Sequence, residues 1–142
     1  MSATLLDLNV LIALTWPSHE HHRPIHSWFL ERRRKRWATC SFTQVGFVRL
    51  SSNPRVVDPP ASPETAAELL RRLVSRKDHD FWSDSLNVID DDWPADWVRG
   101  HRQITDSHLA RLARYHRGTL ATLDKGLALA LGSLAEPIMG ET

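Results

Sequence analysis

The stretch from Ile104 to Gly132 constrains the fold most, because it has the pattern of a helix, a turn, a buried strand and a second helix. Apolar positions at helical spacing predict one buried stripe and outward-facing arginines; they are Leu109, Leu112, Ala113 and His116. The apolar run Thr119–Leu123 predicts a strand that ends at Asp124, and Asp106 stands at the start of the preceding helix. In a parallel α/β layer both carboxylates would lie near the carboxyl edge of the sheet, where such sheets bind ligands.

The N-terminal segment repeats this order of strand, acid and helix. Thr4–Leu6 predicts a short strand, Asp7 closes it, and Leu8–Leu14 predicts a helix that ends before Pro17. Asp7 should therefore stand on the same edge as the other two aspartates. Any one of the three could simply cap a helix, because aspartate accepts a backbone N–H at a helix start. Three converging acids would repel one another unless a cation bridges them, and Mg²⁺ is held by a few carboxylates plus water.

The rest of the chain predicts helices and strands in alternation. The expected elements are a helix over about 24–36, a strand at 37–40, a helix opened by a capping box from Ser41 to Gln44, a helix from Ser62 to about Lys77, a strand at 86–89, a helical turn near Trp97 and an edge strand at 137–139. Inward-facing positions of the helix after Ser41 are expected at Phe42, Val45, Phe47 and Val48. The order β-α-α-β-α-α-β-α-β-α-β favours a parallel sheet between helical layers.

The composition fits one soluble domain over residues 1–142, with 42% hydrophobic and 25% charged residues. No apolar run approaches the roughly 20 residues that cross a bilayer. The N-terminal residues lack the basic region of a signal peptide. One cysteine, Cys40, excludes an internal disulfide and suits a reducing compartment. These features predict a cytoplasmic protein with no membrane association.

The basic residues are mainly arginine, which makes up 15 of the 18 Lys and Arg residues, although the net charge is only +1. The guanidinium fork matches phosphate geometry better than an ammonium group does. The run from Glu31 to Arg36 is interpreted either as a solvated helix end or as a phosphate contact. Arg111, Arg114 and Arg117 are further candidates for gripping a nucleic acid.

Two other polar clusters have ordinary interpretations beside functional ones. The histidines between His19 and His26 could ligate zinc, but the fuller ligand pattern of a structural zinc site is missing, so a polar helix start is favoured. The run Asp90–Asp92 could reach the sheet edge, but aspartates before a proline are typical of a solvated turn.

The six tryptophans could stack on unpaired bases, although burial in a core or an interface is favoured.

Three segments together resemble a PIN-domain ribonuclease, and in particular the VapC toxins of type II toxin–antitoxin systems. They are LLDLNVLIAL, TCSFTQVGFVRLSSNP and ITDSHLARLARYHRGTLATLD, and they occur in the family's order over nearly the whole chain. The resemblance implies a PIN-like three-layer α/β/α sandwich with a central, mainly parallel sheet. It also implies a Mg²⁺- or Mn²⁺-dependent endoribonuclease that cleaves structured RNA such as tRNA or rRNA, forms a homodimer and is inhibited by a cognate VapB-type antitoxin.

The resemblance assigns roles to individual residues. Asp7, Asp106 and Asp124 match the family's catalytic, metal-binding acids. Asn9 matches a supporting polar residue two places after the first acid. Gln44 stands where the family usually has a glutamate, so it is a catalytic position that lacks one negative charge, where the amide could order a metal-bound water.

Two other classes of function compete with the nuclease. The first is a catalytically weak PIN-like module that binds RNA or a partner, because Gln44 replaces an acid. The second is a phosphotransfer fold with acids at a sheet edge. A haloacid-dehalogenase-like phosphatase needs an acid where Asn9 stands, and a receiver domain needs an acid adjacent to Asp7, so both are disfavoured.

Overall fold

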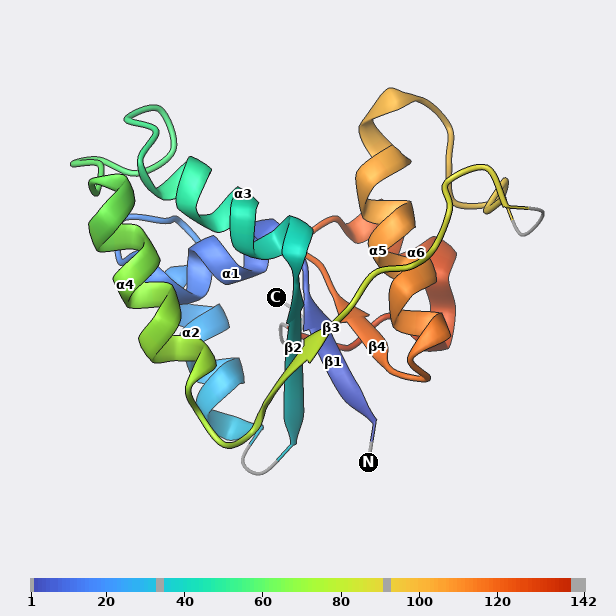
Figure 1. The fold of residues 1–142 in the computed structure, drawn as a ribbon. Coiled ribbons are helices and arrows are strands. Elements are labelled where there is room, and N and C mark those ends of the chain that lie inside the picture. The colour runs from blue at the N-terminus through green and yellow to red at the C-terminus, as the bar shows by residue number, and fades with distance from the viewer. Residues whose placement is uncertain (1, 33–34, 91–92, 139–142) are drawn as a thin grey trace.

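A computed structural model describes residues 2–32, 35–90 and 93–138, and it is built on one parallel sheet (Figure 1). The strands are β1 (Ala3–Leu6), β2 (Arg36–Cys40), β3 (His79–Trp82) and β4 (Thr119–Ala121), in the order β3-β2-β1-β4. Every pairing is parallel, with Thr4 of β1 opposite both Trp37 and Thr119. The segments that follow β1 and β4 therefore leave the sheet side by side at its carboxyl edge.

Helices cover both faces of the sheet, which confirms the predicted three-layer α/β/α sandwich (Figure 1). One face carries α1 (Leu8–Thr15), α2 (His22–Glu31), α3 (Ser41–Ser51) and α4 (Pro63–Val74). The other face carries α5 (Ile104–Tyr115), preceded by the 3₁₀ turn η1 (His101–Gln103), and α6 (Lys125–Leu131), followed by η2 (Gly132–Leu134).

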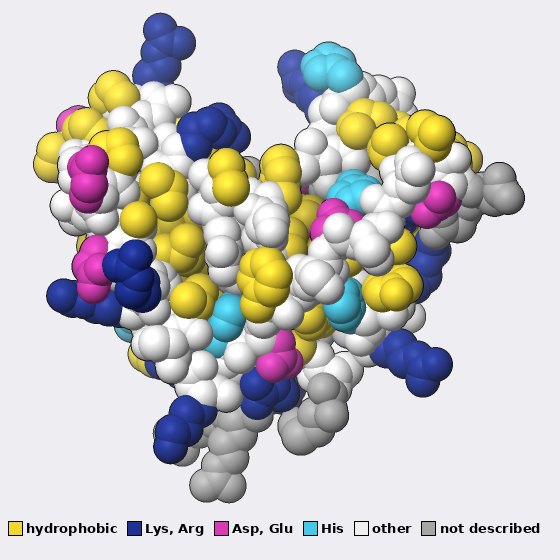
Figure 2. Space-filling model, in the orientation of Figure 1, with side chains coloured by type: hydrophobic (Ala, Val, Ile, Leu, Met, Phe, Trp, Pro, Cys, Tyr) yellow, Lys and Arg dark blue, Asp and Glu magenta, His cyan; other side chains and the backbone are white. Residues whose placement is uncertain are grey.

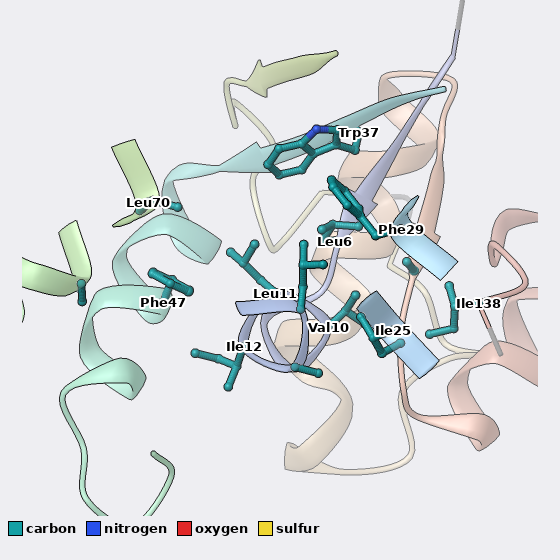
Figure 3. Close-up of a cluster of buried hydrophobic side chains, with 14 residues drawn as sticks. Leu6, Val10, Leu11, Ile12, Ile25, Phe29, Trp37, Phe47, Leu70 and Ile138 are labelled. Atoms are coloured by element: carbon teal, nitrogen blue, oxygen red, sulfur yellow. The ribbon is translucent and has the colours of Figure 1, made fainter. Parts of the chain in front are cut away.

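The strand residues alternate between two cores, as the period of two in a strand requires. Leu6 and Trp37 pack into the core under α1 to α4, where Figure 3 shows the Trp37 ring beside Phe29. Leu5 and Ala38 pack into the core under α5 and α6. Both faces of the central strand β1 are buried, and its residues are apolar except for Thr4.

Several helix starts follow the expected capping chemistry. The Ser62 hydroxyl accepts a hydrogen bond from the Thr65 amide at 3.1 Å, and Pro63 occupies the first turn of α4. The capping box assigned to Ser41 and Gln44 is wrong by one position. The N-cap of α3 is Cys40, whose amide donates to the Thr43 hydroxyl at 3.0 Å.

Two predicted strands are wrong. Residues 86–89 form a loop that ends in a turn, and Ile89 is 81% exposed; the third strand is His79–Trp82 instead. No strand forms at 137–138, and Met139 lies outside the described residues. Instead, Ala135 makes a single parallel bridge to Leu120.

The inward faces of α3 and α5 also differ from expectation. Phe42 and Val45 are exposed, while Phe47 is fully buried. Arg111 on α5 is only 2% exposed, although the arginines of that helix were expected to face solvent. Within the described residues, no helix is both long enough and apolar enough to cross a bilayer.

Candidate active site

Asp7 closes β1 and caps α1 at the carboxyl edge of the sheet. Its Oδ1 accepts a hydrogen bond from the Leu8 amide at 2.6 Å, and its Oδ2 accepts one from the Thr122 hydroxyl at 2.9 Å. Its own amide donates to the Ala121 carbonyl at 2.9 Å, so the end of β1 is tied to the end of β4. The residue is 4% exposed, which leaves the carboxylate in one orientation.

Thr122 connects the first acid to the last. Its hydroxyl donates to Asp7 and accepts from the Asp124 amide at 3.1 Å. Asp124 caps α6, because its Oδ1 accepts from the Leu127 amide at 3.0 Å. The sequence analysis did not single out Thr122; the signal available was a hydroxyl residue two places before an aspartate, directly after a buried strand. The capping interpretation holds for Asp7 and Asp124 and leaves the second oxygen of Asp124 free of a hydrogen bond within the described residues.

The three aspartates are close enough to influence one another electrostatically. Burial, and then the nearby charge of Asp106, raise the pKa of Asp7 to about 7, although hydrogen bonds from Thr122 and Leu8 favour its ionised form. Burial, and then the charge of Asp124, raise the pKa of Asp106. Among the described residues, no ion pair joins any of these acids to Lys, Arg or His. The carboxylates therefore repel one another.

The carboxylate oxygens of the aspartates suit a hard divalent ion, but within the described residues three side chains do not surround a common point. In the parts of the chain that the structure describes, no three His, Cys, Asp or Glu side chains are close enough together to hold an ion. The same finding removes support for zinc at the histidines, where the His22 Nδ1 instead lies 2.7 Å from the Ala13 carbonyl oxygen. Mg²⁺ retains several waters and is usually bound through only one or two carboxylates. It therefore does not need direct contacts from all three aspartates.

Gln44 and Asn9 contribute less to this cluster than expected. The Gln44 Nε2 donates to the Thr39 hydroxyl at 3.0 Å, and the side chain lines a groove between α3 and α4 beside Val48 and Leu70. Asn9 is exposed on α1. No hydrogen bond within the described residues joins either side chain to the three aspartates. Their catalytic roles remain predictions.

The basic run after α2 does not surround the carboxylates. Arg32 is 8% exposed, and its guanidinium donates to the Thr4 hydroxyl and the Arg36 carbonyl, both at 3.0 Å. Arg36 pairs with Asp80 through Nε and Oδ2 at 2.8 Å. These contacts lie at the starts of β1 and β2, the sheet edge opposite the acids. Arg33 and Arg34 lie outside the described residues, as do Asp91 and Asp92 of the acidic run.

The tryptophans serve mainly the interior. Trp93 is 46% exposed, whereas Trp16, Trp28, Trp37, Trp82 and Trp97 are buried or half-buried. Trp82 stacks on His116 with ring centroids 4.6 Å apart. Figure 2 shows a notch in the surface between the α3 side and the α5 side, above the carboxyl edge of the sheet. Of the tryptophans, Trp97 lines a cavity that Asp124 also borders.

Comparison with known proteins agrees with this arrangement. The PIN domain family matches residues 4–130. Ribonuclease VapC38 of Mycobacterium tuberculosis is 42% identical over 123 residues, covering 87% of this chain and 86% of that protein. Ribonuclease VapC39 of the same organism is 41% identical over 125 residues, covering 87% of this chain and 90% of the relative. Ribonuclease VapC29 is 40% identical over 131 residues, covering 92% of each chain.

Proposed function

Because the chain belongs to the PIN-domain family, with VapC ribonucleases among its relatives, we propose that it is a Mg²⁺- or Mn²⁺-dependent endoribonuclease toxin. One observation carries the proposal: Asp7, Asp106 and Asp124 interact electrostatically at the carboxyl edge of a parallel sheet, and within the described residues no salt bridge joins them to a cationic side chain. Such a cluster would repel an RNA phosphate unless an ion neutralised it.

The residues of this chain would hold the ion and keep its ligands in place. When bound, a divalent ion lowers the pKa of a coordinated water and offsets negative charge on the reacting phosphate. Asp7 is oriented by Leu8 and Thr122, and Asp124 by its capping bond to Leu127, so neither must be ordered on binding. Asp106, on the first turn of α5, would complete the set. In-line attack by water on the phosphorus, with cleavage of the P–O3′ bond, would leave a 5′-phosphate and a 3′-hydroxyl without use of the RNA 2′-hydroxyl.

The proposal extends to partners. The substrate would be a structured RNA, with tRNA and rRNA as candidates, and a cognate VapB-type antitoxin would inhibit the enzyme in the cytoplasm. The family also favours a homodimer, in which two copies of the chain associate, each folded as a single PIN-like domain. Trp37 and Trp82 are buried within the monomer and three further tryptophans are half-buried, which weakens the argument that the tryptophans were available for that interface.

Replacing Asp124 by asparagine should remove most of the stabilisation by metal. An ion at 100 times its dissociation constant stabilises the native state by about 2.7 kcal/mol, which corresponds to a melting temperature several degrees higher. Asparagine keeps the capping bond to Leu127, so the variant should fold normally. Its amide is nevertheless a weaker metal ligand than the carboxylate. Thermal melts with and without Mg²⁺ or Mn²⁺ measure the effect, with exposed Asp58→Asn as the charge-matched control. A full metal-induced shift in Asp124→Asn would show that Asp124 is not a ligand.

Substitutions at Gln44 separate an active enzyme from a catalytically weak binding module. If this position faces the ion, Gln44→Glu should bind metal more tightly and Gln44→Ala should lose RNA cleavage by at least about tenfold. If its bond to Thr39 only positions α3, all three proteins should bind metal equally and cleave RNA at similar rates. Metal titration and RNA cleavage, measured in parallel, distinguish the two outcomes. An inactive wild type with normal RNA binding would favour the binding module.

A further inference from the structure

A cavity lies directly beside the proposed catalytic acids. It has a volume of about 480 Å³ and lies between the 96–103 segment and α6. Asp124 borders it, so the cavity and the carboxylate cluster share one wall. Ligand pockets have volumes of this order, about 300–1,000 Å³. If the scissile phosphate is held at Asp7, Asp106 and Asp124, a neighbouring nucleotide falls at the mouth of this cavity.

Trp97 lines the cavity, and its neighbours already hold this residue in place. The Arg114 guanidinium lies 4.9 Å from the centre of the Trp97 ring. The Trp97 amide donates to the Pro94 carbonyl at 2.9 Å, and the Trp97 carbonyl accepts from the Ser107 hydroxyl at 3.4 Å. The side chain also packs against the core under α5 and α6. Because folding has already ordered this side chain, a base that stacks on it would not pay the entropy cost of ordering it.

The charges in the cavity favour a base over a phosphate. Two of the described lining residues, Asp96 and Asp124, are acids, and one, Arg99, is a cation. Two carboxylates at close range repel a phosphate, whereas a neutral base carries no such penalty. A carboxylate only accepts hydrogen bonds, so Asp96 suits an exocyclic amino group, whereas the single N3–H of uracil lies between two carbonyl oxygens that repel a carboxylate. The Gln103 Oε1 is taken by the Arg99 amide at 3.2 Å, which leaves the Gln103 Nε2 and the Arg99 guanidinium as donors.

We propose that this cavity holds the unpaired nucleobase next to the scissile phosphate, stacked against Trp97, and that Asp96 selects a base with an exocyclic amino group over uracil. The inference rests on the proposed function and specifies its substrate: RNA cleaved at an unpaired position flanked by adenine, guanine or cytosine. Trp97 and Asp96 thereby determine specificity, and neither is required for the chemistry at the phosphate.

The test begins with the RNA ends produced on induced expression, which locate the cleaved bond. Synthetic RNAs containing that bond in a single-stranded segment then carry A, G, C, U or an abasic nucleotide at each flanking position. Wild type should cleave the U and abasic forms more slowly than the amino-bearing forms at one of the two positions. Trp97→Ala should lose about 5- to 100-fold in kcat/KM on the preferred base, the range that base–aromatic stacking supplies, and far less on the abasic RNA. Trp97→Phe, which keeps a ring, should recover most of the loss.

Asp96→Asn should change the preference itself. An amide both donates and accepts, so it can pair with the carbonyl groups of uracil, and the ratio of amino-bearing to uracil substrates should fall by about tenfold. The controls are Trp93→Ala, an exposed tryptophan outside this cavity, and Asp58→Asn. Thermal melts with Mg²⁺ should give the wild-type metal shift in every variant.

The outcomes separate this inference from the proposed function. If wild type cleaves no RNA with Mg²⁺ or Mn²⁺ present, the proposed function fails. If wild type cleaves RNA without a base preference, or if Trp97→Ala loses as much on the abasic RNA as on the preferred one, the nuclease stands and the base cavity is wrong. An unchanged preference in Asp96→Asn likewise removes Asp96 from specificity.

Discussion

Asp7→Asn should abolish RNA cleavage and yet make the metal-free protein more stable. Asp7 is 4% exposed, and burial followed by the charge of Asp106 raises its pKa from 3.8 to about 7. That difference of about 3 pKa units corresponds to at most about 4 kcal/mol at 1.36 kcal/mol per unit. Neighbouring groups relax, so we expect about 1–3 kcal/mol and a melting temperature several degrees higher at pH 8. The loss of a metal ligand should reduce cleavage by a factor of at least about 1,000.

Asparagine fits the hydrogen bonds around Asp7 with one adjustment. Its Oδ1 can still accept from the Leu8 amide. Its Nδ2 must donate to the Thr122 hydroxyl, which at present donates to Asp7 and accepts from Asp124, so the hydroxyl proton must turn elsewhere. This adjustment reduces the gain in stability without reversing it, because a buried charge has been removed.

The pH dependence has a defined sign. Because the folded-state pKa of Asp7 lies above its unfolded value of 3.8, the native state binds the proton more tightly between pH 3.8 and about 7. The contribution of Asp7 to stability is therefore greatest below pH 3.8 and is lost as pH rises to about 7. Asp7→Asn lacks this loss, so its advantage over wild type should grow across that window. Magnesium should reverse the order at pH 8 by stabilising wild type alone.

Thermal melts of both proteins between pH 5 and pH 8.5, with and without Mg²⁺, measure these effects beside RNA cleavage. Asp58→Asn, at an exposed position, should follow wild type throughout. If metal-free Asp7→Asn is less stable than wild type at pH 8, the buried Asp7 carboxylate does not destabilise the metal-free fold.

The proposed acids were predictable because the signal that places them is local. Asp7 directly follows a buried strand, Asp124 caps the helix that begins shortly after another, and Asp106 lies in the first turn of a helix; parallel strands bring such positions to one edge. Asp7, Asp106 and Asp124 needed only the strand and helix patterns and their alternation. The period of two also separated the cores, as Leu5 and Leu6 face opposite layers.

The parts that could not be predicted depend on long-range contacts. β3 is partly exposed and its residues His79–Trp82 lack an apolar pattern, whereas the apolar residues Val88 and Ile89 lie in an exposed turn. Arg32 appeared to belong to a solvated run, but a contact across the fold to Thr4 buries it. The cavity beside Asp124 is lined by residues about 25 positions apart in sequence, so no local spacing predicts it. Tertiary packing decides each of these features.

Gly118→Ala should cause the largest loss of stability among substitutions away from the acids. Gly118 links α5 to β4, and its amide donates to the Ala113 carbonyl at 2.8 Å. A methyl group at this position would lie 2.2 Å from the Ala3 carbonyl oxygen and 2.7 Å from Cη2 of Trp82. The obstacle at Ala3 is backbone that pairs with Arg36, and Trp82 is 6% exposed, so neither neighbour can move cheaply. We expect a loss of about 3 kcal/mol or more.

The same substitution should also weaken the site, because β1 and β4 end in Asp7 and in the Thr122–Asp124 segment. A methyl group wedged between these strands should lower the melting temperature by roughly 10 °C and reduce both the metal-induced shift and RNA cleavage. Gly100→Ala is the matched control, because no atom lies within 4 Å of its added carbon and its backbone is extended, so it should be neutral or slightly stabilising. If Gly118→Ala melts within about 2 °C of wild type and keeps its metal shift, the strands can separate locally. The positions of Asp7 and Asp124 would then depend on the Thr122 hydroxyl rather than on the close approach of β1 and β4.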